Sequence, residues 1–230
     1  MLPTRRPIAA LLILLATALL ATATFAQQPR TLILLDPAHG GPDAGAHLPN
    51  NLLEKDITLA LATRLKATLT AAGFPVVTTR DTDPAAAIPP DQRAGAANHA
   101  RPAACLLLHA TAAGTPGIHL ITSALPAATE PPRTIPWDTA QSAALPQSLL
   151  LANELGLSLQ NAKLPVTLTR ASLRPLDNLT CPAVVIEVAP LANPESTPTP
   201  VSDPAYQQRL AEAIAAALTT WRTHLAGAAQ

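Results

Sequence analysis

The chain has 230 residues with 15 basic and 15 acidic side chains, so its formal net charge is zero. A hydrophobic fraction of 48% excludes an intrinsically disordered protein, and the lack of a basic excess argues against a nucleic-acid-binding protein. Nine scattered glycines form no glycine-rich phosphate loop, and two cysteines are too few for a disulfide scaffold or a cysteine-rich zinc finger.

The beginning of the chain has the pattern of a targeting segment. Two arginines precede an uncharged apolar run, and residues 24–26 (Thr-Phe-Ala) offer a small-residue cleavage site. The strongest apolar stretch, residues 8–20, is shorter than the ~20 residues that span a bilayer, which disfavours the alternative of a retained membrane anchor. We therefore predict a signal peptide at 1–26, export to the periplasm or cell wall, no membrane attachment after cleavage, and a single domain at 27–230.

Strand and helix patterns alternate along the rest of the chain. Apolar runs typical of buried strands occur at residues 31–35, 75–79, 105–109, 117–122, 166–169 and 183–188. A Gly/Pro/Asn-rich loop is predicted at 38–51 and a proline-rich surface excursion at 123–136. Helices are predicted at 54–73 (with apolar positions from 57 to 69), 91–100, 138–161 (kinked or restarted at Pro146) and 204–225. Alternating strands and helices predict an α/β fold with three αβα layers, a mostly parallel twisted sheet with helices on both faces.

Four chemically suggestive side chains stand at strand ends or at a helix start. His39 follows the first strand, His109 and Glu187 end two later strands, and Glu54 begins the first helix. Because ligands bind at the carboxyl ends of parallel strands, we expect these groups to lie at one edge of the sheet. Two imidazoles and one carboxylate make a three-ligand zinc site with an open fourth position, and another carboxylate can then act as a general base.

The order of short motifs resembles that of the zinc-dependent N-acetylmuramoyl-L-alanine amidases, a family of bacterial cell-wall hydrolases. The similar motifs are Asp-Pro-x-His-Gly-Gly at 36–41, Leu-Leu-Glu-Lys-Asp at 52–56, Thr-Arg-Asp-Thr-Asp at 79–83, Gln-Arg-Ala-x-x-Ala-Asn at 92–98, a hydrophobic run into His at 106–109, Pro-Ala-Val-Val-Ile-Glu at 182–187 and Asn-Pro-Glu at 193–195. The resemblance implies that His39, Glu54 and His109 bind one zinc ion and that Glu187 is the catalytic carboxylate. It further implies hydrolysis of the amide between the lactyl group of N-acetylmuramic acid and L-alanine in peptidoglycan.

Some positions depart from the family pattern without removing a predicted ligand. These positions are Ala38, Thr111, Ala189 and Pro190. They change the loops that are expected to line the site, so we expect them to affect substrate fit and rate more than metal binding. Asp36 has two interpretations. It either fixes the tautomer of a ligating histidine or caps the turn that follows the first strand.

The remaining cysteines, tryptophans and histidines are expected outside the metal site. Cys105 and Cys181 are too far along their strands from the metal to bind it, so we expect two buried free thiols. A disulfide is the alternative, if their strands are neighbours and the Cα atoms lie within about 7 Å. Trp137 and Trp221 are interpreted as helix-packing anchors, so recognition should depend on the stem peptide and lactyl group more than on the glycan. The other histidines are expected at the surface (His47, His99, His224) or in a structural role within a strand (His119).

Two other functions stay open at this point. A zinc carboxypeptidase acting within the stem peptide would need a basic residue for a terminal carboxylate, and Arg170 or Arg174 could supply it. A non-catalytic peptidoglycan-binding relative that kept the ligands is the second alternative. Some amidases of the resembled family carry a helix that covers the metal until a partner withdraws it. Residues 123–141 occupy a suitable place, although their proline content favours a plain surface loop, and any activator protein is unknown.

Overall fold

The structure is a computed structural model that describes residues 31–129, 134–193, 195 and 197–228. The predicted signal peptide at 1–26 lies outside these residues, so it and the domain boundary at 27 stay predictions. Within the part of the chain that is described, no helix combines the length and apolarity needed to cross a bilayer.

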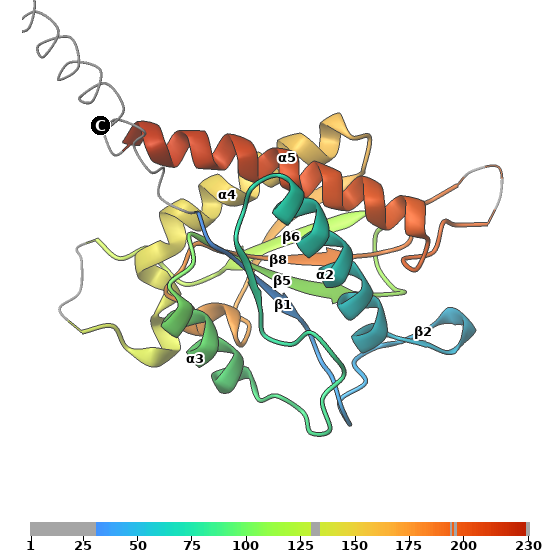
Figure 1. Ribbon diagram of the computed structural model, residues 1–230, viewed down its shortest axis with the longest axis horizontal. Coiled ribbons are helices and arrows are strands. Elements are labelled where there is room, and N and C mark those ends of the chain that lie inside the picture. Colours follow the sequence, from blue (N-terminus) through green and yellow to red (C-terminus); the bar gives the residue numbers. More distant parts are fainter. Residues whose placement is uncertain (1–30, 130–133, 194, 196, 229–230) are drawn as a thin grey trace, which may run out of the picture. The chain divides into compact units, whose positions relative to one another are not determined.

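A six-stranded sheet forms the centre of the fold, in the order β4-β1-β5-β8-β6-β7 (Figure 1). Its strands are β1 (Ile33–Pro37), β4 (Val76–Thr78), β5 (Ala104–Ala110), β6 (Ile118–Ser123), β7 (Val166–Ala171) and β8 (Ala183–Val188). The first four in spatial order are parallel, whereas β6 is antiparallel to β8 and parallel to β7. The carboxyl ends of β1, β5 and β8 therefore share one edge with the beginnings of β6 and β7, and the predicted mostly parallel sheet is confirmed.

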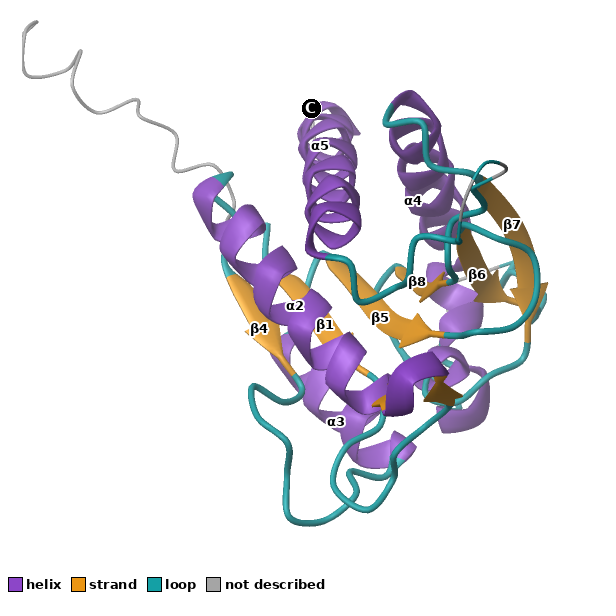
Figure 2. Ribbon diagram, turned by 90° about the vertical axis from the view of Figure 1, so that its right-hand side faces the viewer, coloured by secondary structure: helices purple, strands orange, loops and turns teal. Residues whose placement is uncertain are grey.

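Helices cover both faces of this sheet (Figure 2). Helices α2 (Glu54–Ala71), α4 (Gln141–Asn161) and α5 (Pro204–Ala228) pack on one face, and α3 (Pro90–Ala100) with the 3-10 turn η3 (Leu176–Asn178) packs on the other. Successive strand residues point to opposite faces. Along β5, Leu106 and Leu108 accordingly belong to the larger apolar cluster, while Leu107 belongs to the smaller one. The near-continuous apolar strands thus fill two cores, which confirms the predicted αβα layers.

Helix α2 begins at Glu54, as predicted, with acidic residues in its first turn, where the helix dipole favours negative charge. One detail near the start of the fold differs from the predictions. The loop predicted at 38–51 contains the short strand β2 (His47–Leu48) and the 3-10 turn η1 (Pro49–Asn51), and β2 pairs in antiparallel fashion with β3 (Leu52–Leu53), which follows the loop. Because β3 leads directly into α2, this ribbon fixes where the helix begins.

Helix α4 is continuous through Pro146, so it does not restart there. Proline has no N–H to donate to the carbonyl four residues earlier. The backbone N–H of Ala128 donates to that carbonyl, on Ser142, at 2.9 Å instead. This bond ties the proline-rich excursion to α4. Among the described residues between β6 and α4, the only helical turn is η2 (Trp137–Thr139), directly after the excursion. Since β6 ends at the edge opposite the carboxyl ends of β5 and β8, the excursion leaves the sheet far from the predicted metal.

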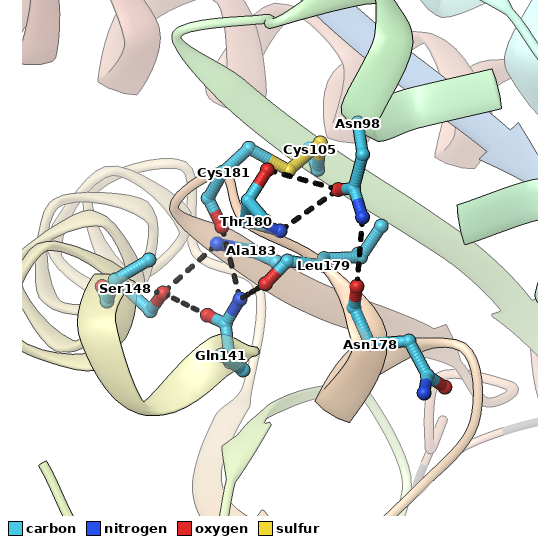
Figure 3. Close-up of a disulfide and its surroundings, with 10 residues drawn as sticks. Asn98, Cys105, Gln141, Ser148, Asn178, Leu179, Thr180, Cys181 and Ala183 are labelled. Atoms are coloured by element: carbon cyan, nitrogen blue, oxygen red, sulfur yellow. Dashed lines mark hydrogen bonds between the residues drawn. A yellow bond between two sulfur atoms is a disulfide. The ribbon is translucent and has the colours of Figure 1, made fainter. Parts of the chain in front are cut away.

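Cys105 and Cys181 form a disulfide, so the expectation of two free thiols is wrong (Figure 3). The S–S distance is 2.03 Å and the two Cα atoms are 6.1 Å apart. Strands β5 and β8 are neighbours, which brings the beginning of β5 beside the segment that leads into β8. Polar side chains surround the bond. Gln141 Nε2 donates to the Cys181 carbonyl at 3.0 Å, and Asn98 Oδ1 accepts the Thr180 N–H at 2.8 Å.

The two tryptophans have different surroundings. Trp221 is buried in the larger apolar cluster, as expected of a packing anchor. Trp137 is 43% exposed and donates to Asp91 Oδ1 at 3.3 Å, so its interpretation as a packing anchor is wrong. The expected surface histidines are exposed, as the burial pattern shows for His47, His99 and His224.

Candidate functional site

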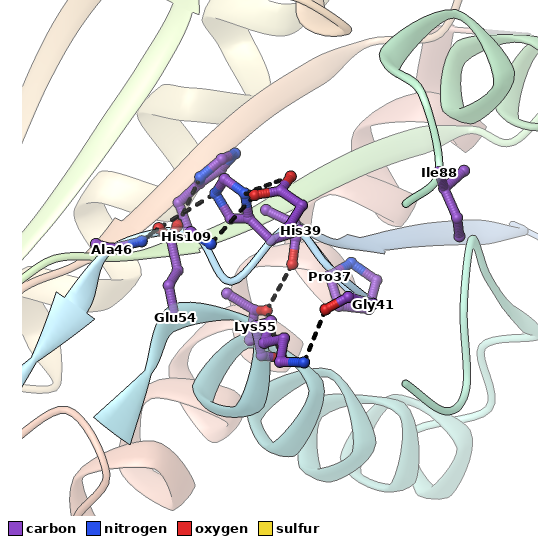
Figure 4. A network of polar contacts seen from close by, with 12 residues as sticks. Pro37, His39, Gly41, Ala46, Glu54, Lys55, Ile88 and His109 are labelled. Carbon is purple, nitrogen blue, oxygen red and sulfur yellow. Dashed lines mark hydrogen bonds and ion pairs between the residues drawn. The ribbon is translucent and has the colours of Figure 1, made fainter. Parts of the chain in front are cut away.

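The carboxyl edge of the sheet brings His39, Glu54 and His109 together (Figure 4). Glu54 Oε1 is 2.9 Å from His109 Nδ1, and Glu54 Oε2 is 3.2 Å from His39 Nε2. The two imidazole rings are perpendicular, with centroids 5.4 Å apart. One nitrogen or oxygen atom from each of the three side chains lies within 4.8 Å of the others. The three predicted ligands therefore form a compact cluster.

Backbone conformation in the loop after β1 makes this approach possible. His39 has a φ of 62°, which turns the chain back toward the start of α2. Gly45 has a φ of 66°, a conformation that favours glycine. A Cβ atom on Gly45 would lie 2.6 Å from His39 Cδ2 and 2.7 Å from Glu54 Oε2. Gly45 is thus required for both the turn and the packing of two predicted ligands.

Glu54 is buried and its carboxylate accepts four hydrogen bonds or ion-pair contacts. Besides the two imidazoles, the backbone N–H groups of Ala46 and Ala110 donate to it at 2.9 and 3.2 Å. Burial alone would raise the pKa of Glu54, but the hydrogen bonds from His109, His39 and the Ala46 amide hold it well below its usual range. The carboxylate is therefore charged in the folded protein.

The pKa of His39 is raised above its ordinary value. The hydrogen bond to Glu54 is the main cause; burial opposes it, and Asp43 adds a second hydrogen bond that also raises the pKa. Negative charge on two sides thus favours positive charge at this imidazole, which is the same electrostatic preference that a bound cation would satisfy.

The donor set fits a zinc ion. Zinc bonds to nitrogen and oxygen of about 2.0–2.1 Å in tetrahedral geometry place ligand atoms about 3.3 Å apart. The two Glu54-to-histidine separations, 3.2 and 2.9 Å, are close to that spacing. The side chains of His39 and His109 are 24% and 31% exposed, so solvent reaches the cluster from one side. Three protein ligands with an accessible side are the arrangement of a catalytic zinc site.

Glu187 lies beside this cluster on the neighbouring strand. It is the in-register partner of His109 across β5 and β8, so the two side chains leave the same face of the sheet. The Glu187 side chain is half-buried, and its carboxylate makes no hydrogen bond or ion pair with any other described residue. A carboxylate without a protein partner beside a candidate metal centre is available to exchange a proton with water or substrate.

The partner of His39 is Asp43, not Asp36. Both Asp43 carboxylate oxygens lie 2.9 Å from His39 Nδ1. A hydrogen on Nδ1 leaves Nε2 free to face the cluster. Asp36 instead accepts hydrogen bonds from Arg93 Nη1 at 2.7 Å and from the Thr79 hydroxyl, so both interpretations offered for Asp36 are wrong.

Two buried arginines hold the backbone that carries His39, a role that the motifs alone did not reveal. Arg80 donates to the carbonyls of Pro37 and Ala38, each at 3.0 Å. Arg93 donates to the carbonyls of Pro37 at 2.9 Å and His39 at 2.5 Å. Three successive carbonyls are thus fixed by two guanidinium groups. The signal available in the sequence was the two arginines' place in the motifs at 79–83 and 92–98.

Replacing Asp43 with alanine is expected to weaken zinc binding by about 10–100-fold, because the orienting partner of a ligating histidine is lost. Competition with a chromophoric chelator measures the zinc affinity. Asp56→Ala, which removes an exposed acid from the first turn of α2, is the matched control for lost negative charge. Equal affinities in the two variants would show that Asp43 does not orient His39.

Comparisons with known proteins identify the family to which the chain is similar. The chain matches the family model described as N-acetylmuramoyl-L-alanine amidase (Amidase_3) over residues 33–220. It is 33% identical over 199 residues to the germination-specific N-acetylmuramoyl-L-alanine amidase of Bacillus subtilis strain 168, covering 80% of this chain and 76% of the relative.

Solved structures share the fold. N-acetylmuramoyl-L-alanine amidase AmiC2 of Nostoc punctiforme superimposes with a TM-score of 0.62 at 24% identity, covering 84% of this chain and 98% of that one. The amidase Ami1 from Mycobacterium smegmatis gives a TM-score of 0.67 at 22% identity, covering 86% and 100%.

Proposed function

This chain belongs to the N-acetylmuramoyl-L-alanine amidase family and is a hydrolase of that type, and from this premise we propose a zinc-dependent reaction on peptidoglycan. The bond cleaved is the amide between the lactyl group of N-acetylmuramic acid and L-alanine. His39, Glu54 and His109 hold one zinc ion, and Glu187 is the catalytic carboxylate. The observation that carries the proposal is the convergence of three ligand-type atoms within 4.8 Å, with Glu187 in register beside them.

Glu187 has two tasks in this proposal. A zinc ion held by His39, Glu54 and His109 would supply an acidified water and a Lewis acid for the amide carbonyl. Glu187 accepts a proton from the attacking water and delivers it to the nitrogen of L-alanine, which cannot leave as an anion. Its lack of a partner among the described residues keeps both carboxylate oxygens available for these transfers.

The positions of the arginines disfavour a carboxypeptidase. Arg170 is in register with Thr122, toward the edge of the sheet opposite the metal centre. Its guanidinium donates to the carbonyls of Ser123 and Leu125 at 2.9 and 2.7 Å. Arg174 follows the end of the same strand. Neither arginine is placed to bind a substrate carboxylate near Glu187.

The site of action proposed is the periplasm or the cell wall. Peptidoglycan lies outside the cytoplasmic membrane, and a disulfide such as Cys105–Cys181 persists in an oxidising compartment. The charged pair of arginines and the apolar run within residues 1–26 would direct this export.

Mass spectrometry of digested peptidoglycan tests the function. The purified protein is expected to release stem peptides that begin with a free L-alanine amino group and to leave muramic acid with a free lactyl carboxylate. A chelator should stop release, and added zinc should restore it. A shortened stem that stays attached to muramic acid would support the carboxypeptidase instead. Binding to peptidoglycan without any release would support the non-catalytic relative.

A further inference from the structure

A row of polar side chains crosses the sheet next to the candidate metal centre. In register, His109 of β5 pairs with Glu187 of β8, Glu187 pairs with His119 of β6, and His119 pairs with Thr167 of β7. Paired residues on neighbouring strands point to the same face, with Cβ atoms about 4.5–5.5 Å apart in direct antiparallel pairs. Glu187 therefore stands between two histidines, with His119 on the side away from the predicted zinc.

The His119 ring is oriented by the loop that joins β5 to β6. Its Nε2 is 2.6 Å from the carbonyl of Thr115. A carbonyl can only accept, so Nε2 carries the hydrogen, and in the neutral ring Nδ1 is an acceptor. Nδ1 has no hydrogen-bond partner among the residues that the structure describes. The loop itself is anchored over the end of β8, since Thr111 N–H donates to the Val188 carbonyl at 2.9 Å.

His119 is also reachable from solvent. Along β6, Ile118 and Leu120 are buried in the larger apolar cluster, whereas His119 points to the other face and is half-buried. Thr167, the next residue of the row, is exposed. An oriented imidazole with one unused acceptor, in a row that begins at the metal centre and becomes exposed at Thr167, is suited to hydrogen bonding with a bound peptide.

We propose that His119 contacts the stem peptide of the substrate, accepting a peptide N–H through Nδ1. This inference rests on the proposed function and follows from the order of groups along the row. The amide carbonyl must lie at the His109 end, where the zinc ligands are. Glu187 must reach the leaving nitrogen. The stem continues from that nitrogen, so the next residue of the row, His119, lies on the stem side of the cleaved bond.

Two substitutions separate this contact from a purely structural role. His119→Gln can keep the hydrogen bond to the Thr115 carbonyl but lacks an acceptor at the Nδ1 position. His119→Asn places an amide oxygen near the Nδ1 position but loses the hydrogen bond to the Thr115 carbonyl. His99→Gln, on the exposed surface of α3, is the matched control. Thermal unfolding of each variant reports any loss of folded protein.

The assay compares a muramoyl tripeptide with N-acetylmuramoyl-L-alanine, which has no peptide N–H beyond L-alanine. We expect His119→Gln to lower kcat/KM about 3–10-fold on the tripeptide, the effect of one lost hydrogen bond, mainly through KM. For N-acetylmuramoyl-L-alanine, the same substitution should change kcat/KM less than about twofold. On the tripeptide, the kcat/KM of His119→Asn should be closer to the wild-type value than that of His119→Gln.

Each other result has a definite meaning. If His119→Gln retains wild-type kcat/KM on the tripeptide and His119→Asn does not, the histidine only tethers the loop and the inference is wrong. Equal losses on both substrates, or none on either, contradict it as well. If the wild-type protein hydrolyses neither substrate but shortens longer stems, the proposed function fails first, and that outcome is recognised without any variant.

Discussion

Replacing Glu187 with glutamine is expected to slow amide hydrolysis by at least about 100-fold while leaving zinc bound. Glutamine has nearly the same shape as glutamate, but its amide cannot accept a proton from water or deliver one to the leaving nitrogen. Loss of a general acid–base group lowers turnover by about 10²–10⁴-fold. Glu187 lies beside His109 without contributing to the cluster of His39, Glu54 and His109, so the zinc content should stay near one ion per chain.

Two further substitutions define what this result means. Glu54→Gln removes the negative charge from the centre of the cluster, so it should lose zinc and activity together. Glu212→Gln, at an exposed position of α5, should change neither. Release of stem peptides and metal content are measured on the same preparations. Persistent turnover in Glu187→Gln would show that another group is the base, and loss of zinc from it would show that Glu187 is a ligand.

The sequence contained enough information to predict the fold class and the grouping of the site. Near-continuous apolar strands alternating with helices are typical of a mostly parallel sheet, and parallel strands place their carboxyl ends at one edge. His109 and Glu187 end such strands, so their adjacency follows once β5 and β8 are neighbours. The grouping of His39 and Glu54 depended on motif order as well, because neither lies within a strand of the main sheet.

The partner of His39 was not predictable because it depends on a backbone turn. Asp36 lies in β1 and points with Leu34 toward the face covered by α3, where it meets Arg93. The positive φ of His39 and the glycine-rich loop then bring Asp43 back to the imidazole. Two acids near one histidine look equivalent in the sequence. Only the dihedral angles of the loop decide between them.

The disulfide was missed for a related reason. Cys105 and Cys181 are separated by 76 positions, and their pairing depends on the order of strands in the sheet. Strand β8 lies between β5 and β6, although β5 and β6 are consecutive in the chain. The spacing of apolar runs along the sequence does not specify that β8 is placed between β5 and β6 in the sheet. The distance between the thiols and the predicted metal was enough to exclude them as ligands but not to exclude a bond between them.

Replacing both Cys105 and Cys181 with alanine is expected to destabilise the protein by about 4 kcal/mol, since the bond closes a long segment and restricts the unfolded chain. At about 2–4 °C per kcal/mol for a chain of this size, the melting temperature should fall by about 8–16 °C. Thermal unfolding followed by circular dichroism measures the shift. A reductant should lower the melting temperature of the wild type but not that of the double variant.

Zinc affinity provides the internal check on that result. The disulfide joins the beginning of β5 to the segment before β8, at the edge of the sheet opposite His39 and His109. At a temperature where the double variant is fully folded, its zinc affinity should therefore equal that of the wild type. Unchanged stability would mean that the bond adds nothing to the fold. Weaker zinc binding in the folded double variant would mean that the two edges of the sheet are coupled, because β5 and β8 carry both the disulfide and the pair His109–Glu187.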